Sequence, residues 1–325
     1  MTEAVIRPAR IEDAEILASL VARLAEAEGS PPPGFDAAIC RRDGFGTNPL
    51  FGSLLAEIDG RPAGYALYHP SYDTDRVVPS VWLADLYVES WARRRGVGRR
   101  LAAKVASLAA ANGDRGMHWC VLKGNATARR FYAKFGHEDN ALLHCFMERA
   151  TLERLAKTPA RSRASLRPAR AGDAPLLGQY LNQLLTYLGE EPLAFDPGPR
   201  LAADGFGAAP RFAAIVAEMN GEPAGHALFW PIYDTDTGGP LMFLSDLLVA
   251  ERFRGQGVAE DLMAAAASRA VAAGHLGMAW EVMHSNRRAR AFYRHIAEES
   301  DRELTVNCAG EDFQRLAAEE SPALP

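Results

Sequence analysis

The sequence has few cysteines and no long apolar run. Its four cysteines, Cys40, Cys120, Cys145 and Cys308, lie far apart, and no Cys-x-x-Cys pair occurs. No cysteine has a histidine at the sequence spacing of a metal site, so we expect unpaired thiols in a reducing cytoplasm and no disulfide framework. The sequence contains no run of about 18 apolar residues, so we expect no transmembrane helix. The first ten residues lack the apolar core of a secretion signal.

A basic domain is also missing. Residues 1–156 carry 20 Lys and Arg against 19 Asp and Glu, whereas residues 166–325 carry 13 against 22. Neither part has the excess of positive charge that is typical of a nucleic-acid-binding domain. The net charge of −9 in the second part favours a cationic substrate or partner.

What the chain does contain is a repeat of domain size. The segment GRPAGYALYHPSYDTD (60–75) returns 161 residues later as GEPAGHALFWPIYDTD (221–236), with 11 of 16 positions identical. The offset stays constant, because Asp43-Gly44-Phe45-Gly46 also returns as Asp204-Gly205-Phe206-Gly207. A period this long is that of a whole domain and not of a solenoid unit. We therefore expect two copies of one domain, at 1–157 and 165–325, joined by the polar segment KTPARSRAS.

Apolar periodicity predicts the same order of elements in both copies. Strands alternate with helices after an early hairpin at Asp59-Gly60, which favours a mixed α/β sheet over a sandwich or a helical bundle. In the first copy, strands are predicted at 5–9, 50–58, 63–69, 81–88, 117–122 and 142–147. Helices are predicted at 11–28, from the turn at 93–98 to about 111, at 126–134 and at 152–157.

A glycine-containing turn links an apolar strand to a helix in each copy. The turns are Arg93-Arg94-Arg95-Gly96-Val97-Gly98 and Arg254-Gly255-Gln256-Gly257-Val258-Ala259. Small residues let backbone N–H groups approach an anion, and the helix N-terminus adds a positive dipole end. The alternative is a tight connection without a ligand. A Walker loop is excluded because no Gly-Lys-Ser/Thr follows, and the acid expected of a dinucleotide fold is out of place.

Single carboxylates stand in otherwise apolar strands at Asp85 and Asp246. A carboxylate is costly there unless it is paired or used, so these residues are candidates to orient an amine or accept its proton. The alternative is a structural acid that hydrogen-bonds backbone or an arginine. The Tyr-Asp turns at 72–75 and 233–236 either collect a cationic amine or form simple Asx-turns.

Taken in order, these features resemble the GCN5-related N-acetyltransferases (the GNAT superfamily). The resemblance rests on the strands around Asp85 and Asp246, the two Arg-x-x-Gly-x-Gly/Ala turns, and the pairs Phe131-Tyr132 and Phe292-Tyr293. Within that superfamily, each copy is similar to the diamine acetyltransferase branch. The implied fold is a mostly antiparallel, splayed sheet flanked by helices, and the implied donor is acetyl-CoA.

The resemblance also implies roles for individual residues. Tyr132 and Tyr293 would protonate the departing thiolate of CoA, and a tyrosine hydroxyl can supply that proton. Packing on a helix face is the alternative for both. The two turns would hold the diphosphate of CoA. The pantetheine arm would meet the backbone of Leu86, Tyr87 and Val88, or of Leu247, Leu248 and Val249, together with Asn125 or Asn286, which are also expected as helix caps.

Some positions depart from the family pattern. Arg94 replaces a usual glycine, so the turn of the second copy is more open, which favours that copy as an active half. Ala84 and Ser245 stand where the diamine branch carries a glutamate, which weakens polyamine as the substrate.

The expected activity is direct attack of a small-molecule or peptide primary amine on acetyl-CoA. Two alternatives remain: a non-catalytic acyl-CoA-binding or sensing module, and one active half with a structural second half. We expect the halves to pack as an internal pseudo-dimer, with a homodimer of the chain also open, and no nucleic-acid or membrane partner.

Overall fold

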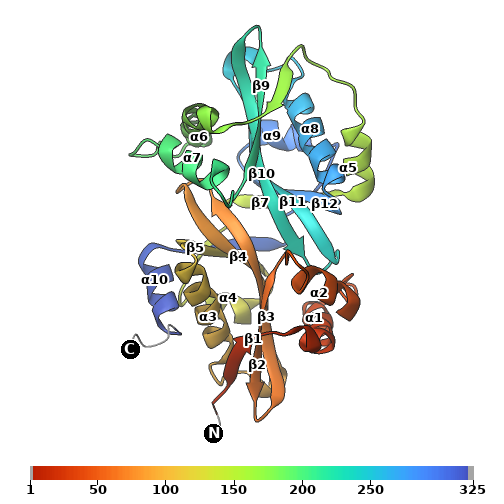
Figure 1. The fold of residues 1–325 in the computed structure, drawn as a ribbon, viewed down its shortest axis with the longest axis vertical. Coiled ribbons are helices and arrows are strands. Elements are labelled where there is room, and N and C mark those ends of the chain that lie inside the picture. The colour runs from red at the N-terminus through yellow and green to blue at the C-terminus, as the bar shows by residue number, and fades with distance from the viewer. Residues whose placement is uncertain (1–2, 321–325) are drawn as a thin grey trace.

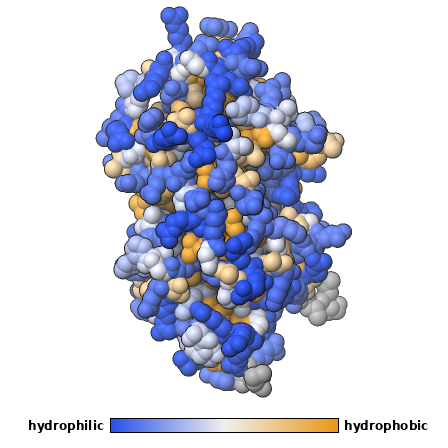
Figure 2. All heavy atoms as spheres, turned by 180° about the vertical axis from the view of Figure 1, so that it is seen from behind, coloured by the Kyte–Doolittle hydropathy of each residue, from blue (hydrophilic) through white to orange (hydrophobic). Residues whose placement is uncertain are grey.

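A computed structural model gives the structure of the protein and describes residues 3–320. Its two halves lie end to end along the long axis of the molecule, each with one twisted sheet and flanking helices (Figure 1). None of the described helices is both long and apolar enough to cross a membrane. Seen from behind, the surface is mainly hydrophilic, with small scattered apolar areas (Figure 2).

Each sheet has seven strands, and in each the strands are mostly antiparallel. The first sheet has the order β1-β2-β3-β4-β5-β14-β6. Its strands are β1 (Val5–Pro8), β2 (Gly52–Ile58), β3 (Arg61–Asp73), β4 (Val78–Val88), β5 (Gly116–Leu122), β14 (Glu303–Ala309) and β6 (His137–Asp139). The second sheet has the order β13-β7-β12-β11-β10-β9-β8. Its strands are β13 (Glu298–Ser300), β7 (Leu142–Glu148), β12 (Gly277–Met283), β11 (Gly239–Val249), β10 (Glu222–Asp234), β9 (Ala213–Met219) and β8 (Ser165–Pro168).

The helices follow the predicted order, except that each copy contains one further short helix that the sequence pattern did not predict. In the first copy they are α1 (Ala14–Glu28), α2 (Ala37–Gly44), α3 (Val97–Ala111), α4 (Ala126–Tyr132) and α5 (Arg149–Ala156). In the second copy they are α6 (Ala174–Leu188), α7 (Gly198–Phe206), α8 (Val258–Ala272), α9 (Arg287–Tyr293) and α10 (Gly310–Ala318). Short 3-10 turns precede α1, α3, α6 and α8, at Ile11–Asp13, Ser90–Ala92, Ala171–Asp173 and Glu251–Phe253. The predicted α/β class is confirmed.

The two copies exchange their last strands. Strand β7 of the first copy pairs with β12 of the second along its whole length, and β14 of the second copy pairs with β5 of the first in the same way. The closing helices follow, so that α5 packs on α8 and α10 on α3, as Figure 1 shows. The core of each half accordingly contains side chains of both copies: Leu304, Val306 and Phe313 lie in that of the first half.

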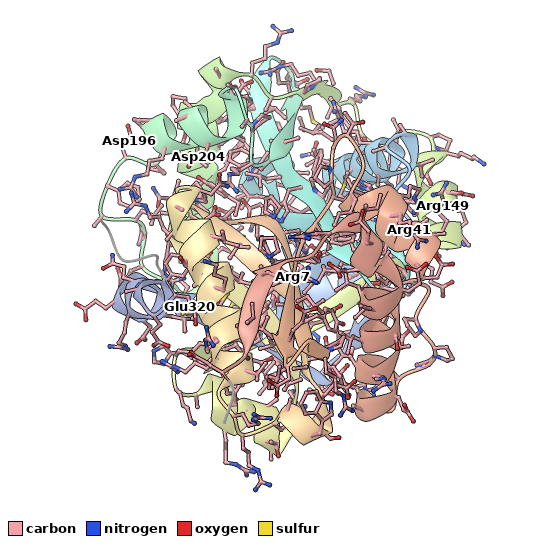
Figure 3. The ribbon with its side chains drawn as sticks, turned by 60° about the horizontal axis from the view of Figure 1, so that its bottom comes forward. Arg7, Arg41, Arg149, Asp196, Asp204 and Glu320 are labelled. Atoms are coloured by element: carbon pink, nitrogen blue, oxygen red, sulfur yellow. The ribbon has the colours of Figure 1, made fainter. Side chains whose placement is uncertain are left out.

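A second contact joins the copies through the ends of the long hairpins. The hydroxyl of Tyr72 donates to Asp204 on α7 (3.0 Å), and that of Tyr233 donates to Asp43 on α2 (2.9 Å). Asp204 is labelled in Figure 3. This pair of reciprocal hydrogen bonds gives a structural reason for the repeated Asp-Gly-Phe-Gly and Tyr-Asp segments, which the sequence alone did not connect.

Candidate active site

Strand β4 leaves its neighbour β5 shortly after it starts. It stays paired with β3 as far as Val88, but it pairs with the parallel strand β5 only at Val81 and Trp82. Leu86, Tyr87 and Val88 therefore lie beyond the point where the two strands separate. In the second copy β11 and β12 pair only at Met242 and Phe243, so Leu247, Leu248 and Val249 have the same position. The splayed sheet implied by the family resemblance is present in both halves.

The turn after β4 is open in the first copy. Gly96 is the N-cap of α3 with φ +81°, and a Cβ added to it would meet nothing within 4 Å. Residues 93–96 are exposed, and the buried Val97 and half-buried Gly98 begin the helix. Exposed backbone at the start of a 15-residue helix is suited to an anion. This arrangement fits the diphosphate of CoA.

Two arginines of this turn have specific conformations. Arg93 donates through Nε to the carbonyl of Val88 (2.9 Å), so it ties the turn to the end of β4. Its counterpart Arg254 donates to Val249 in the same way (3.1 Å). Arg94 has φ +62°, a left-handed conformation that favours glycine, and Gly255 has φ +74° at the same place in the second copy. The backbone shape of the turn is thus kept even where arginine replaces glycine.

The corresponding turn in the second copy is covered by the linker. A Cβ added to Gly257 would lie 2.9 Å from Cβ of Arg161 and 3.0 Å from its carbonyl carbon. The backbone N–H groups of Arg161 and Ser162 donate to Asp261 in the first turn of α8 (2.7 and 2.8 Å). The expectation of a more open second turn is therefore wrong, because the chain itself packs against Gly257.

Charge also differs between the two helix starts. The first turn of α8 carries Glu260 and Asp261, which already neutralise the positive end of the helix dipole. The same positions of α3 are Arg99 and Arg100, which pair with Glu319 and Glu320. The start of α8 is therefore acidic, whereas the arginines at the start of α3 are balanced by glutamates, which makes α8 the less suitable of the two for a diphosphate.

A central cavity of about 1090 Å³ lies between the halves and is lined by both copies. Its described lining is strongly acidic, with Arg76 as the one lysine or arginine. The twelve acidic lining residues are Glu28, Asp73, Asp75, Asp85, Asp139, Glu190, Glu191, Asp234, Asp236, Glu281, Glu298 and Glu303. Such a cavity favours a cation over an anion or a neutral ligand.

Asp85 is buried at the wall of this cavity. It is 7% exposed, and it accepts hydrogen bonds from the hydroxyls of Tyr65 (2.9 Å) and Thr235 (3.2 Å). The β3–β4 register shifts by one residue at Ala84, and this bulge lies directly before Asp85. Burial raises the pKa of Asp85 to about 7, which the two hydrogen bonds oppose. A carboxylate with this pKa can accept a proton near neutral pH.

Tyr132 lines the same cavity. It is the last residue of α4, and its ring packs on Trp119 (5.0 Å between centroids) and Phe131 (5.1 Å). Burial raises its pKa, so its hydroxyl carries a proton at neutral pH. The aromatic packing and the proton-donating interpretation are thus compatible. The structure brings Tyr132 and Asp85 to one cavity.

The second copy does not build this arrangement. Asp246 accepts from the neighbouring Ser245 (3.0 Å) and lies 3.8 Å from His226, which occupies the place of Tyr65. Thr74, the counterpart of Thr235, contacts the hydroxyl of Ser245 and not Asp246. Neither Asp246 nor Tyr293 is among the described lining residues of the central cavity.

The remaining predicted residues have clear local roles. Asn125 and Asn286 cap α4 and α9, accepting from the N–H groups of Ala128 and Ala289 (3.0 and 3.1 Å). In the Tyr-Asp turns the aspartate stabilises its own turn, since Asp73 accepts from the N–H of Arg76 and Asp234 from that of Thr237, each three residues on. Both turns also line the cavity, so a local structural role is compatible with the prediction that they collect a cationic amine.

Comparison with known proteins gives the family. The model of the acetyltransferase (GNAT) family matches the chain twice, at residues 19–137 and 181–297. The chain belongs to the acetyltransferase (GNAT) family. Each match covers the strand acid, the glycine turn and the helix with the tyrosine of one copy, which confirms the tandem arrangement expected from the repeat.

Curated GNAT relatives match a stretch about as long as one copy. Thialysine N-epsilon-acetyltransferase of Bos taurus is 32% identical over 158 residues, covering 45% of this chain and 92% of that protein. The Mus musculus enzyme of the same name is 34% identical over 143 residues, covering 41% and 84%. Spermidine/spermine N(1)-acetyltransferase-like protein 1 of Homo sapiens is 30% identical over 144 residues, covering 41% and 20%. The chain is an N-acetyltransferase.

Solved GNAT structures share the whole fold. A tandem GNAT protein from the clavulanic acid biosynthesis pathway covers 94% of this chain and 98% of its own, with a TM-score of 0.50 and 15% identity. A GCN5-related N-acetyltransferase from Sphaerobacter thermophilus covers 94% and 95%, with a TM-score of 0.51 and 17% identity. At this identity the likeness concerns the fold.

Proposed function

We propose that the protein uses acetyl-CoA to acetylate a cationic aliphatic amine at one site, formed by the first copy and closed by the second. The observation that carries the proposal is the acidic central cavity with Asp85 and Tyr132 in its wall. The curated relatives are named for thialysine and for spermidine and spermine, which supports an amine on an aliphatic chain.

The first copy has the groups that would hold acetyl-CoA. The turn from Arg93 to Gly98, exposed at 93–96, would hold the diphosphate, and the strand edge at Leu86 to Val88 would pair with the pantetheine arm. Asn125, the cap of α4, would contact the pantetheine or its surroundings, as the family resemblance implies. When bound, acetyl-CoA supplies an acetyl group activated as a thioester. The covered Gly257 and the acids at the start of α8 support binding at the first copy alone.

Proton transfers are assigned to two side chains. The amine enters the acidic cavity as an ammonium ion, and Asp85 accepts its proton through a carboxylate oxygen. The neutral nitrogen then attacks the acetyl carbon directly, while backbone N–H groups of the splayed strand polarise the carbonyl. A nitrogen–carbon bond forms, the carbon–sulfur bond breaks, and the hydroxyl of Tyr132 protonates the leaving sulfur. The nitrogen then loses its second proton, which restores the hydroxyl of Tyr132, and the products are the amide and free CoA. No covalent enzyme intermediate is required.

Binding titrations test the assignment to one copy. Isothermal titration with acetyl-CoA is expected to give one site per chain in the unmodified protein. Gly96→Glu removes that site, and the matched Gly257→Glu retains it, provided that circular dichroism shows both variants folded. Two sites per chain, or loss of binding in Gly257→Glu alone, would contradict the assignment.

A thiol-release assay tests catalysis. Release of free CoA with diamines and lysine analogues, but not with their N-acetylated forms, is the expected result. Acetyl-CoA binding without thiol release across a broad panel of amines would instead favour the non-catalytic acyl-CoA-binding alternative.

A further inference from the structure

The repeat and its strand exchange bring several polar side chains together where the two sheets meet. Positions 120 and 281 are equivalent, and so are positions 144 and 305, because each pair is 161 residues apart. Strand exchange pairs Cys120 with Thr305 across β5 and β14, and Glu281 with His144 across β12 and β7. The hydroxyl of Thr305 also donates to the carboxylate of Glu281. Four side chains from four strands thus meet at one place.

A fifth side chain, Glu303, completes a set of possible metal ligands. One ligand atom each of Cys120, His144 and Glu303 lie within 4.8 Å of one another. The sulfur of Cys120 is 3.9 Å from either ring nitrogen of His144, and Nδ1 of His144 is 3.6 Å from a carboxylate oxygen of Glu281. All of these residues are half-buried and line the central cavity, so an ion can reach them.

The distances from His144 to Cys120 and to Glu281 are close to those between two ligand atoms that bind the same zinc ion. Zinc–sulfur and zinc–nitrogen bonds of about 2.3 and 2.0 Å place the two atoms about 3.6 Å apart in a tetrahedron. The observed spacings of 3.9 and 3.6 Å are within a few tenths of an ångström of that value. The contacts of His144 with Cys120 and Glu281 are longer than ordinary N–H···O hydrogen bonds, although one oxygen of Glu281 already accepts from Thr305.

We propose that Cys120, His144 and Glu303 bind a zinc ion at the strand crossing, with Glu281 as the fourth ligand. A thiolate and an imidazole select zinc over magnesium or calcium, which prefer oxygen ligands alone. Binding releases the thiol proton of Cys120. The ion would join β5 and β14 of the first sheet to β7 and β12 of the second, and would thereby stabilise the exchanged arrangement. The site shares the central cavity with the proposed amine site but uses neither of its proton-transfer residues, Asp85 and Tyr132.

Cobalt is a suitable spectroscopic probe of the site. After dialysis against a chelator, titration of the full chain with Co²⁺ is expected to give one equivalent bound, with a thiolate-to-cobalt charge-transfer band that Zn²⁺ abolishes by displacement. Cys120→Ala loses the band, and the control Cys308→Ala, altered at a buried cysteine on β14, retains it. His144→Thr, which installs the residue of the other copy, and Glu303→Gln weaken binding by more than about tenfold.

Thermal unfolding gives a second measurement. Zn²⁺ is expected to raise the melting temperature of the unmodified protein and of Cys308→Ala, and not that of Cys120→Ala or His144→Thr. The proposal fails if the unmodified protein shows no charge-transfer band, or if Cys120→Ala keeps it. Should Cys120→Ala not fold, unchanged Co²⁺ affinity in both His144→Thr and Glu303→Gln overturns the proposal.

Discussion

The hydroxyl of Thr235 in the second copy donates a hydrogen bond of 3.2 Å to Asp85 in the first copy. The proposed proton acceptor of one copy is therefore tuned by a residue of the other. Because this bond stabilises the charged form of Asp85, it lowers the pKa that burial raises. The second copy thus contributes to the site even though its own glycine turn is covered.

Replacing Thr235 by valine is expected to move the pH dependence of the reaction. Loss of one hydrogen bond to the carboxylate raises the pKa of Asp85 further, by about one unit. The acidic limb of the kcat/KM profile then shifts to higher pH by a similar amount. The matched control is Thr74→Val, because Thr74 contacts Ser245 and not a strand carboxylate. Equal profiles for the two variants would exclude this role for Thr235.

Asp85→Asn separates activity from stability. Burial raises the folded-state pKa of Asp85 from 3.8 to about 7, so between these values the folded protein binds more protons than the unfolded chain. Its stability therefore falls as pH rises through this window. The variant cannot titrate, so we expect it to unfold at a higher temperature than the unmodified protein at about pH 8, with the difference vanishing near pH 4.

The same variant should lose turnover. Without the carboxylate, kcat/KM is expected to fall about 100-fold at neutral pH, and its dependence on pH near 7 to disappear. Calorimetric scans and initial rates over the same pH series measure both effects. An unchanged rate in a folded Asp85→Asn protein would remove Asp85 from the mechanism.

The two family tyrosines provide a matched pair. Tyr132→Phe is expected to lower kcat about 100-fold while leaving acetyl-CoA affinity unchanged, because only the proton donor is lost. Tyr293→Phe is expected to leave kcat unchanged, since Tyr293 is not among the described lining residues of the cavity. Initial rates and binding titrations decide. A larger loss in Tyr293→Phe would move the active site to the second copy.

The linker contact at Asp261 can be tested by proteolysis. Asp261→Ala leaves the N–H groups of Arg161 and Ser162 without their acceptor, which costs about 2 kcal/mol of stability in this contact. Trypsin is then expected to cut the linker faster than in the unmodified protein. Glu260→Ala, the neighbouring residue of the same helix turn, serves as the control. Equal cleavage rates in both variants would show that Asp261 does not hold the linker.

Much of the local structure could be predicted from the sequence. The strand of Asp85 was expected at 81–88 and is found at 78–88, and the helix after the glycine turn ends at Ala111 as expected. Apolar periodicity and turn chemistry act over a few residues, so they are visible in one copy alone. Helix α2 was missed because its eight residues give too short a periodic pattern, although Asp36 caps it.

The long-range arrangement could not be predicted. Strands β7 and β14 are equivalent in the repeat, so the sequence allows either of them to pair with β5 or with β12. Exchange leaves the apolar pattern unchanged, and the sequence therefore does not distinguish it from two separate domains at 1–157 and 165–325. Two contacts depend on that arrangement: the packing of Arg161 against Gly257, and the hydrogen bond from Thr235 to Asp85. The sequence could not predict either contact for the same reason.

Exchange of the last strands has a consequence for how the chain can be divided. Because each half completes its sheet with a strand from the other, the peptide bonds of the linker are not what holds the molecule together. A chain nicked once after Arg161 is expected to migrate as a single particle until it is unfolded. By the same reasoning, either copy produced alone would present an incomplete sheet, and would recover a full one only by pairing with a second molecule of itself.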